Sequence, residues 1–119
     1  MYQIFNFTLK GPKEQKDTGF IEMCDWIKNN LPEESVFGSV DIPHWIYLYS
    51  GYKSGPRIPM TKDDNKIIDF IKRNNYDYLV VSPNFGRSYQ YLKPAIEKNI
   101  HMFSVVYSKN GNIIYKVLQ

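Results

Sequence analysis

The hydrophobic pattern of the chain is clearest at Tyr76–Pro83 (YDYLVVSP), where apolar residues follow one another without polar interruption. Leu79–Val81 is continuously apolar, and Pro83 closes the run. A run this short, rich in β-formers and lacking alternation, is typical of a strand buried on both faces. We therefore predict a central strand over 76–82, in the middle of a sheet with helices above and below it.

Helical spacing predicts three helices around this strand. Asp17 or Thr18 is expected to cap a helix that runs to about Asn30. A capping box at Thr61–Asp64 is expected to start a second helix, which ends near Asn75. A third covers roughly 87–99, and Pro94 inside it should split it into a first turn and a true helix. Their apolar faces carry Phe20, Met23, Cys24, Ile27 and Leu31 in the first helix, and Ile67, Phe70 and Ile71 in the second.

The remaining segments predict further strands. Val36–Val40 is a strand whose Gly38 allows close backbone approach, and Arg57–Pro59 is a short extended piece on a sheet edge. Asn110-Gly111 is a strong hairpin signal, so the flanking runs should pair antiparallel. These runs are 102–108 and 113–118. Between the predicted strands, a two-turn helix over 43–50 is expected to end at Gly51.

This order of elements predicts an α/β domain. Alternating helices and strands favour parallel strands joined by right-handed crossovers. The predicted fold is a three-layer, Rossmann-like, mostly parallel sheet of four or five strands with a C-terminal antiparallel hairpin. Residues 1–16 are read as an N-terminal arm or edge strand followed by a linker, and 17–119 as a single α/β domain.

Composition limits the classes of function. The 119 residues suffice for one domain, and a net charge of +3 from dispersed basic residues does not favour a nucleic-acid partner. Cys24 is the single cysteine and His44 and His101 stand apart, so we expect no disulfide, metal site or cofactor. No apolar segment approaches the ~20 residues that span a bilayer, and no signal peptide is visible, although a segment upstream of Met1 is left open.

The loop Ser82–Arg87 (SPNFGR) is the most site-like stretch. In open α/β sheets, ligands bind at the carboxyl ends of the strands, where this loop is expected to lie. Ser82, Asn84, Gly86 and Arg87 would supply the donors, and Arg87 at a helix start would hold an anion. The alternative is a turn whose proline and glycine serve only its geometry.

A second candidate is the tyrosine-rich stretch that follows Pro43. Three tyrosines fall within six residues on a predicted short helix and turn, so the stretch either packs over the sheet edge or forms a docking surface. The candidate surface residues are His44, Tyr47, Tyr49, Tyr52 and Lys53.

Four segments of the chain carry a resemblance to a known protein family. Cys24–Pro32 is similar to a "WI…N.P" helix end, and Tyr47–Pro56 to a "YLYSGRK…P" segment, with Tyr52 in place of the arginine. Tyr76–Pro83 is similar to "DYVVVSP", and Ile113–Val117 to a closing "…VYRV" strand. In this order and spacing the four segments resemble the soluble C-terminal domain of multi-pass membrane glycosyltransferases, of the dolichyl-phosphate-mannose–protein mannosyltransferase and aminoarabinose-transferase type. The resemblance covers residues ~18–118.

This resemblance implies an accessory role. The catalytic acid and the lipid-phosphate site of that family lie in its membrane part, so none of them maps onto this chain. It implies an extracytoplasmic domain whose partners are the membrane-embedded part of the parent protein and a glycan or lipid-phosphate sugar. The isolated domain would not be an enzyme, although its parent would be a glycosyltransferase. The alternatives are a free-standing small-molecule or anion-binding domain and a protein-interaction module.

Overall fold

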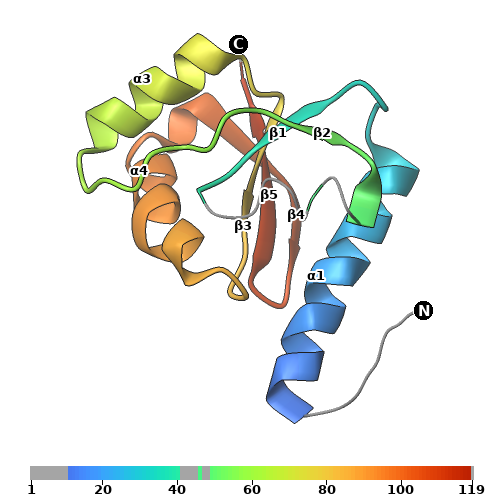
Figure 1. Ribbon diagram of the computed structural model, residues 1–119. Coiled ribbons are helices and arrows are strands. Elements are labelled where there is room, and N and C mark those ends of the chain that lie inside the picture. The colour runs from blue at the N-terminus through green and yellow to red at the C-terminus, as the bar shows by residue number, and fades with distance from the viewer. Residues whose placement is uncertain (1–10, 41–45, 47–48, 119) are drawn as a thin grey trace.

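A five-stranded sheet lies between two layers of helix in the computed structural model (Figure 1). The structure describes the backbone of residues 11–40, 46 and 49–118, and the side chains among these from Thr18 onward. The strand order is β2-β1-β3-β5-β4. The strands are β1 (Val36–Gly38), β2 (Lys53–Ser54), β3 (Tyr78–Val81), β4 (Phe103–Lys109) and β5 (Asn112–Val117).

The sheet is mixed. β1 pairs in parallel with β2 and β3, whereas β5 pairs antiparallel with both β3 and β4. The predicted α/β class and the C-terminal antiparallel pair are confirmed. The Rossmann-like description is not confirmed, because the antiparallel strand β5 lies between β3 and β4, where a doubly wound fold would continue with a parallel neighbour.

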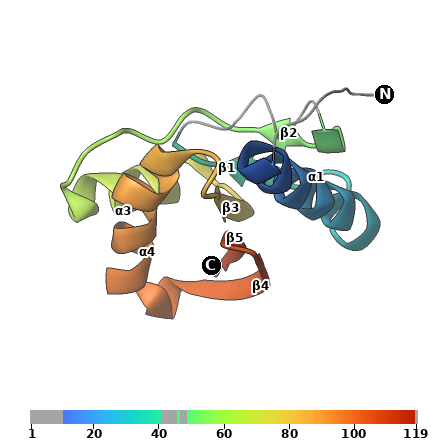
Figure 2. The ribbon, with the colours of Figure 1, turned by 90° about the horizontal axis from the view of Figure 1, so that it is seen from below.

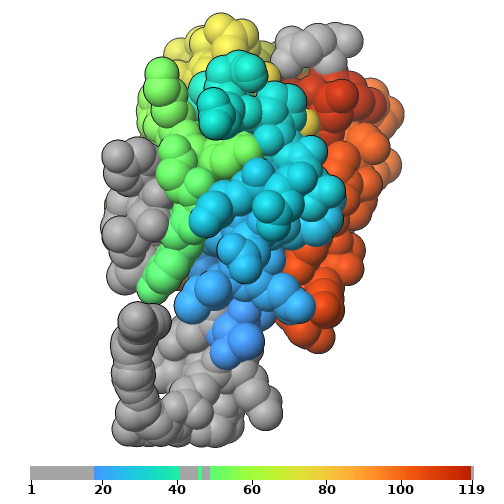
Figure 3. Space-filling model, turned by 90° about the vertical axis from the view of Figure 1, so that its right-hand side faces the viewer, coloured from blue at the N-terminus to red at the C-terminus, as the bar shows by residue number. Residues whose placement is uncertain are grey.

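Helices cover both faces of the sheet. Helix α1 (Gly11–Asn30) lies on one face, and α3 (Asp64–Asn74) and α4 (Lys93–Lys98) lie on the other, as Figure 2 shows. Helix α1 also reaches the edge strand β4 (Figure 3). There the rings of Trp26 and Tyr107 are 5.1 Å apart between centroids, and Lys109 Nζ is 2.8 Å from Glu22 Oε2.

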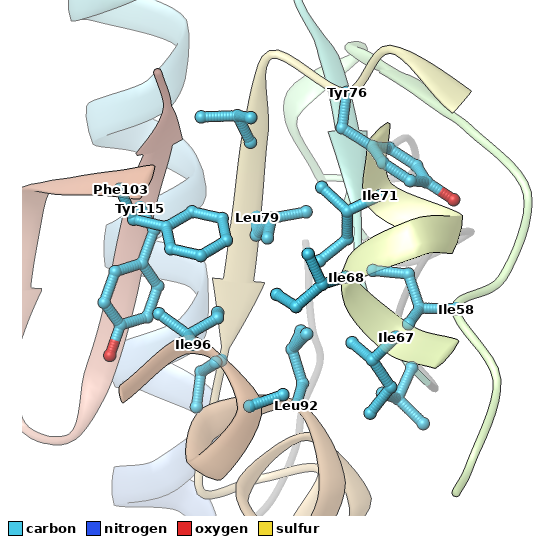
Figure 4. Packing of buried hydrophobic residues seen from close by; sticks show 14 residues of the cluster. Ile58, Ile67, Ile68, Ile71, Tyr76, Leu79, Leu92, Ile96, Phe103 and Tyr115 are labelled. Carbon is cyan, nitrogen blue, oxygen red and sulfur yellow. The ribbon is translucent and has the colours of Figure 1, made fainter. Parts of the chain in front are cut away.

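Strand β3 is the centre of the fold, as predicted. Its four residues are buried. Leu79 and Val81 pack into the cluster formed with α3 and α4, and Tyr78 and Val80 pack into the cluster formed with α1. Figure 4 shows Leu79 facing the side chains of α3 and α4. Because side chains alternate along a strand, an unbroken apolar run is required when both faces are covered.

A tyrosine between two glycines joins the strands β1 and β2 to α3. Tyr76 is fully buried, its ring stacks on Phe70 at 6.5 Å between centroids, and its hydroxyl donates to the carbonyl of Pro56. A Cβ on Gly38 would lie 2.5 Å from Tyr76 Cδ1, and one on Gly55 would lie 2.6 Å from Cε1. The ring therefore lies flat against backbone that only glycine leaves open.

Several boundaries differ from the sequence predictions. Helix α1 begins at Gly11, within the predicted linker, and not at Asp17 or Thr18. The N-cap of α3 is Asp63 and not Thr61, because the Asp63 carboxylate accepts from two backbone N–H groups of the first turn. The edge strand is Lys53–Ser54 and not 57–59.

Two predicted segments lie wholly or largely outside the described residues. The strand or arm at 2–9 is wholly outside, so the domain division remains a prediction. Of the helix predicted at 43–50, the structure describes Ile46, Tyr49 and Ser50, which have helical backbone. Gly51 follows with φ 81°, the left-handed conformation expected of a glycine that ends a helix.

The predicted division of this helix near Pro94 is present as a change of helix type, while the backbone stays helical through it. A π-helical turn, η1 (Ser88–Leu92), precedes α4, and the backbone N–H of Lys93 donates to the carbonyl of Ser88. Pro94 then lies in the first turn of α4, where its missing N–H is tolerated. A 3₁₀ turn, η2 (Ile100–Met102), leads into β4, and the Asn110-Gly111 hairpin has positive φ at both residues, as predicted.

Candidate functional site

The loop Ser82–Arg87 lies at the carboxyl end of β3, as predicted. The strand next to β3 in the sheet is β1. The chain continues from β1 to β2 on one side of β1, and later to β3 on the other side. Ligands of open α/β sheets bind at such a change of direction. The hydroxyl of Ser39, which follows β1, donates to the carbonyl of Val80 at 2.7 Å and ties the two strand ends together.

The inner part of the loop is held by buried side chains. Ser82 and Ser88 are fully buried and Asn112 is 1% exposed. Ser82 Oγ donates to Asn112 Oδ1 at 2.6 Å, and the Ser82 N–H donates to Ser88 Oγ at 3.0 Å. Ser88 Oγ in turn donates to the carbonyl of Phe85 at 2.8 Å. These hydroxyls therefore hold the loop on the end of the sheet and are not presented to a ligand.

The outer part of the loop is open. Asn84 is partly buried, and its N–H donates to Ser82 Oγ at 3.2 Å. Gly86 and Arg87 are exposed, and a Cβ on Gly86 would meet nothing within 4 Å. The structure thus brings Ser82 and Asn84 together and leaves the Arg87 guanidinium on the surface, where it can meet an anion.

Sequence reasoning missed Asn112 and Tyr89 as parts of this loop's support. Asn112 begins β5, thirty positions beyond Ser82. The Tyr89 hydroxyl donates to the carbonyl of Gly111 in the hairpin turn, and the Phe85 ring packs on Phe20 of α1 at 5.3 Å. The Asn-Gly signal indicated a hairpin there, but no local pattern indicated what the hairpin would touch.

Of the predicted tyrosine-rich surface, the described residues are partly exposed and partly buried. Tyr49 is 40% exposed, with its ring edge against Phe20, and Lys53 is exposed on β2. Tyr52 is only 5% exposed, and its hydroxyl donates to the carbonyl of Leu31 at 2.5 Å. Burial raises the pKa of Tyr52, and the charges of Glu33 and Glu34 raise it further. Tyr52 therefore belongs to the core; His44 and Tyr47 lie outside the described residues.

The single cysteine is expected to be unreactive in the folded protein. Cys24 is fully buried on α1, and burial, assisted by the charge of Asp25, raises the pKa of its thiol from 9.0 to about 12. Because the thiolate is the reactive form, labelling by a thiol reagent should proceed only as fast as the protein opens. Native labelling at the rate of a denatured control would contradict this prediction.

The raised pKa of Cys24 also makes the free energy of unfolding depend on pH. Between pH 9 and pH 12 an unfolded chain loses the Cys24 proton while the folded chain keeps it. The unfolded state then binds fewer protons, so the free energy of unfolding falls as the pH rises through this window. Tyr76, whose pKa burial raises to about 12, acts in the same direction.

The described part of the chain contains no group of three or more His, Cys, Asp or Glu side chains placed to hold a metal ion. Within the same residues, no helix is long and apolar enough to cross a membrane. His101, in the turn before β4, is exposed.

Comparison with known proteins gives a likeness of fold. No protein family and no curated protein matches the chain by sequence. The structure is similar to the crystal structure of the C-terminal globular domain of an oligosaccharyltransferase from Archaeoglobus fulgidus, with a TM-score of 0.50 and 12% sequence identity. The likeness covers 92% of this chain and 99% of that chain, so it extends over the whole of a domain. At this identity it shows the fold alone.

Proposed function

We propose that this chain is a non-catalytic, extracytoplasmic accessory domain of a membrane glycosyltransferase that uses a polyprenyl-phosphate sugar. One observation carries the proposal. The fold is similar, over 92% of this chain, to the C-terminal globular domain of an oligosaccharyltransferase. The resemblance of four segments to the mannosyltransferase and aminoarabinose-transferase type supports the same class of parent protein.

The local roles of five of the nine carboxylates whose side chains the structure describes support an accessory part. Asp63 caps α3, and Asp77 accepts from the backbone of Val36. Three others, Glu22, Asp64 and Glu97, form ion pairs with lysines. Carboxylates used in this way contribute to local stability and are not held as a general acid and base.

The domain would act by positioning. Arg87 is exposed at the carboxyl end of β3, and a guanidinium can hold a phosphate or stack on a ring. Tyr49 and Asn84 are the other described candidates for contact with a glycan or a lipid-phosphate headgroup, and Tyr47 is a candidate from the sequence. The membrane-embedded part of the parent protein is the proposed partner.

The test separates this domain from its parent. The purified 119-residue chain, given a polyprenyl-phosphate sugar and an acceptor, should show no transfer above a heat-killed control. The encoding gene should contain apolar segments of ~20 residues upstream of this domain. In membranes that carry the whole protein, removal of residues 11–119 should lower transfer, and Arg87→Ala should lower it more than Lys116→Ala, which removes an exposed cation elsewhere.

Two results would refute the proposal. Turnover by the isolated chain would show that it is itself an enzyme. A whole protein that transfers sugar at the full rate without residues 11–119 would show that the domain has no accessory role. Equal effects of Arg87→Ala and Lys116→Ala would remove only Arg87 from the proposed contact.

A further inference from the structure

The two helical layers carry opposite charge. On one face of the sheet, residues 18–35, which contain the described side chains of α1 and the turn after it, hold one lysine and four carboxylates. On the other face, residues 57–74 and 86–98, which contain α3, α4 and the segments before them, hold eight cations and four carboxylates. Figure 2 shows these layers on opposite sides of the sheet. Charge is therefore separated across the thickness of the domain.

The carboxylates on the α3/α4 side do not cancel its positive charge. Lys98 Nζ pairs with Asp64 at 2.9 Å and Lys93 Nζ with Glu97 at 2.6 Å. The other six cations of this layer are exposed, against the remaining carboxylates Asp63 and Asp69. The six exposed cations are Arg57, Lys62, Lys66, Lys72, Arg73 and Arg87.

One of these cations is held in place at the surface. The Arg73 guanidinium lies over the Phe70 ring at 5.9 Å, and Phe70 stacks in turn on the buried Tyr76. Lys66, Phe70 and Arg73 recur at helical spacing, so they share one stripe of α3. The stack runs from the buried Tyr76 to the exposed Arg73, and Arg73 Nε also donates to the carbonyl of Asp69, so this cation has a fixed place at the surface.

An apolar side chain lies among the cations. Met60 is 47% exposed, in the segment that connects β2 to α3. This segment is anchored beside α3, because Ile58 is fully buried in the cluster that contains Ile67 and Ile71 (Figure 4). Arg57 and Lys62 flank Met60 in the chain. Exposed apolar residues between basic ones are typical of surfaces that rest on anionic lipid.

We infer that the α3/α4 layer is the face by which this domain lies against an anionic phospholipid surface, with the α1 layer directed away from it. The six exposed cations are spread over α3, the segment before it and the turn before η1, which fits a plane of phosphate groups better than the clustered patch of a nucleic-acid binder. The inference rests on the proposed function for the choice of a membrane as partner, and it adds which face of the domain meets the lipid.

Vesicle binding tests the inference directly. The purified chain is sedimented with phosphatidylcholine vesicles, and with vesicles of phosphatidylcholine mixed with phosphatidylglycerol, at low and at high salt. We expect binding to the anionic vesicles only, and its loss at high salt, because exposed charges are screened. Lys62→Gln, Lys66→Gln and Lys72→Gln combined should lower the partition coefficient roughly tenfold or more, since lysines near an anionic surface contribute additively.

The chain offers a matched control for this variant. Lys28, Lys53 and Lys116 are also exposed lysines but lie outside the α3/α4 layer, so changing all three to glutamine removes the same charge. This control should bind within about twofold of the parent chain. Met60→Asp, at an exposed position, should weaken binding without unfolding the domain, as checked by a thermal melt.

Three outcomes would overturn the inference. The chain could fail to bind anionic vesicles, both lysine variants could lose binding equally, or an RNA homopolymer could compete the chain off the vesicles. The assay contains no sugar donor and no acceptor. It can therefore fail while the transfer experiment succeeds, and it can succeed while the transfer experiment fails.

Discussion

Replacing Gly38 by alanine is expected to destabilise the domain more than the same change at any other glycine whose surroundings the structure describes. The new Cβ would lie 2.5 Å from Cδ1 and 2.6 Å from Cε1 of Tyr76, closer than atoms pack. The ring has little room to retreat, because it also lies against Gly55, where a Cβ would be 2.6 Å from Cε1, and because its hydroxyl donates to the carbonyl of Pro56. Overpacking costs about 1–3 kcal/mol and occasionally more, and between rigid groups we expect about 3 kcal/mol or more.

Chemical denaturation measures this loss as a lower midpoint with an unchanged slope. Gly86→Ala is the control, because Gly86 is exposed and a Cβ there meets nothing within 4 Å. The free energy of unfolding of this control should stay within about 0.5 kcal/mol of the parent chain's. If Gly38→Ala instead raised the midpoint, as expected where alanine only reduces the freedom of the unfolded chain, Tyr76 would not lie where the structure places it.

Val80→Asp is expected to prevent folding. Val80 is fully buried at the centre of β3, in the cluster that contains Phe20, Ile27 and Ile114. An unpaired carboxylate there has no partner and costs several kcal/mol, against a total stability of about 5–15 kcal/mol for a domain. The chain should lose its cooperative thermal transition and its near-ultraviolet circular dichroism.

Val105→Asp provides the comparison, because Val105 is 52% exposed on the edge strand β4. It introduces the same side chain in place of the same residue, and it should melt cooperatively near the parent temperature. A soluble Val80→Asp variant with the parent's midpoint would show that β3 is not the central strand.

Much of the fold follows from patterns within single segments. The unbroken apolar run at Leu79–Val81 specified a strand covered on both faces, since both alternating sets of side chains needed burial. Asn110-Gly111 specified the hairpin, because both residues tolerate the positive φ that the turn requires. Pro94 specified the end of a helical turn through the backbone N–H that it lacks.

The N-cap of α3 was a choice between two nearby residues, whereas the strand predictions depended on partners far away in the chain. Thr61 and Asp63 are both suitable N-caps, and local sequence could not choose between them. The edge strand formed at Lys53–Ser54 because this segment pairs with β1, whereas Arg57–Pro59 continues as a connection whose Ile58 packs on α3. The Rossmann-like expectation was not confirmed for a related reason, because the hairpin signal does not specify which of its strands pairs with β3.

The candidate site divides in the same way. By itself, the sequence determined that a polar loop would follow β3, because a strand that ends at Pro83 must be followed by a connection. Only the tertiary structure decided which of its groups are available. The Ser82 hydroxyl donates its hydrogen bond to Asn112, and the Tyr52 hydroxyl donates to the carbonyl of Leu31. Both bonds form because buried polar groups need hydrogen-bond partners, and the fold decides which partners are near. The opposite charges of the two helical layers were likewise present in the sequence, but they became a property of two faces only when the sheet placed the layers apart.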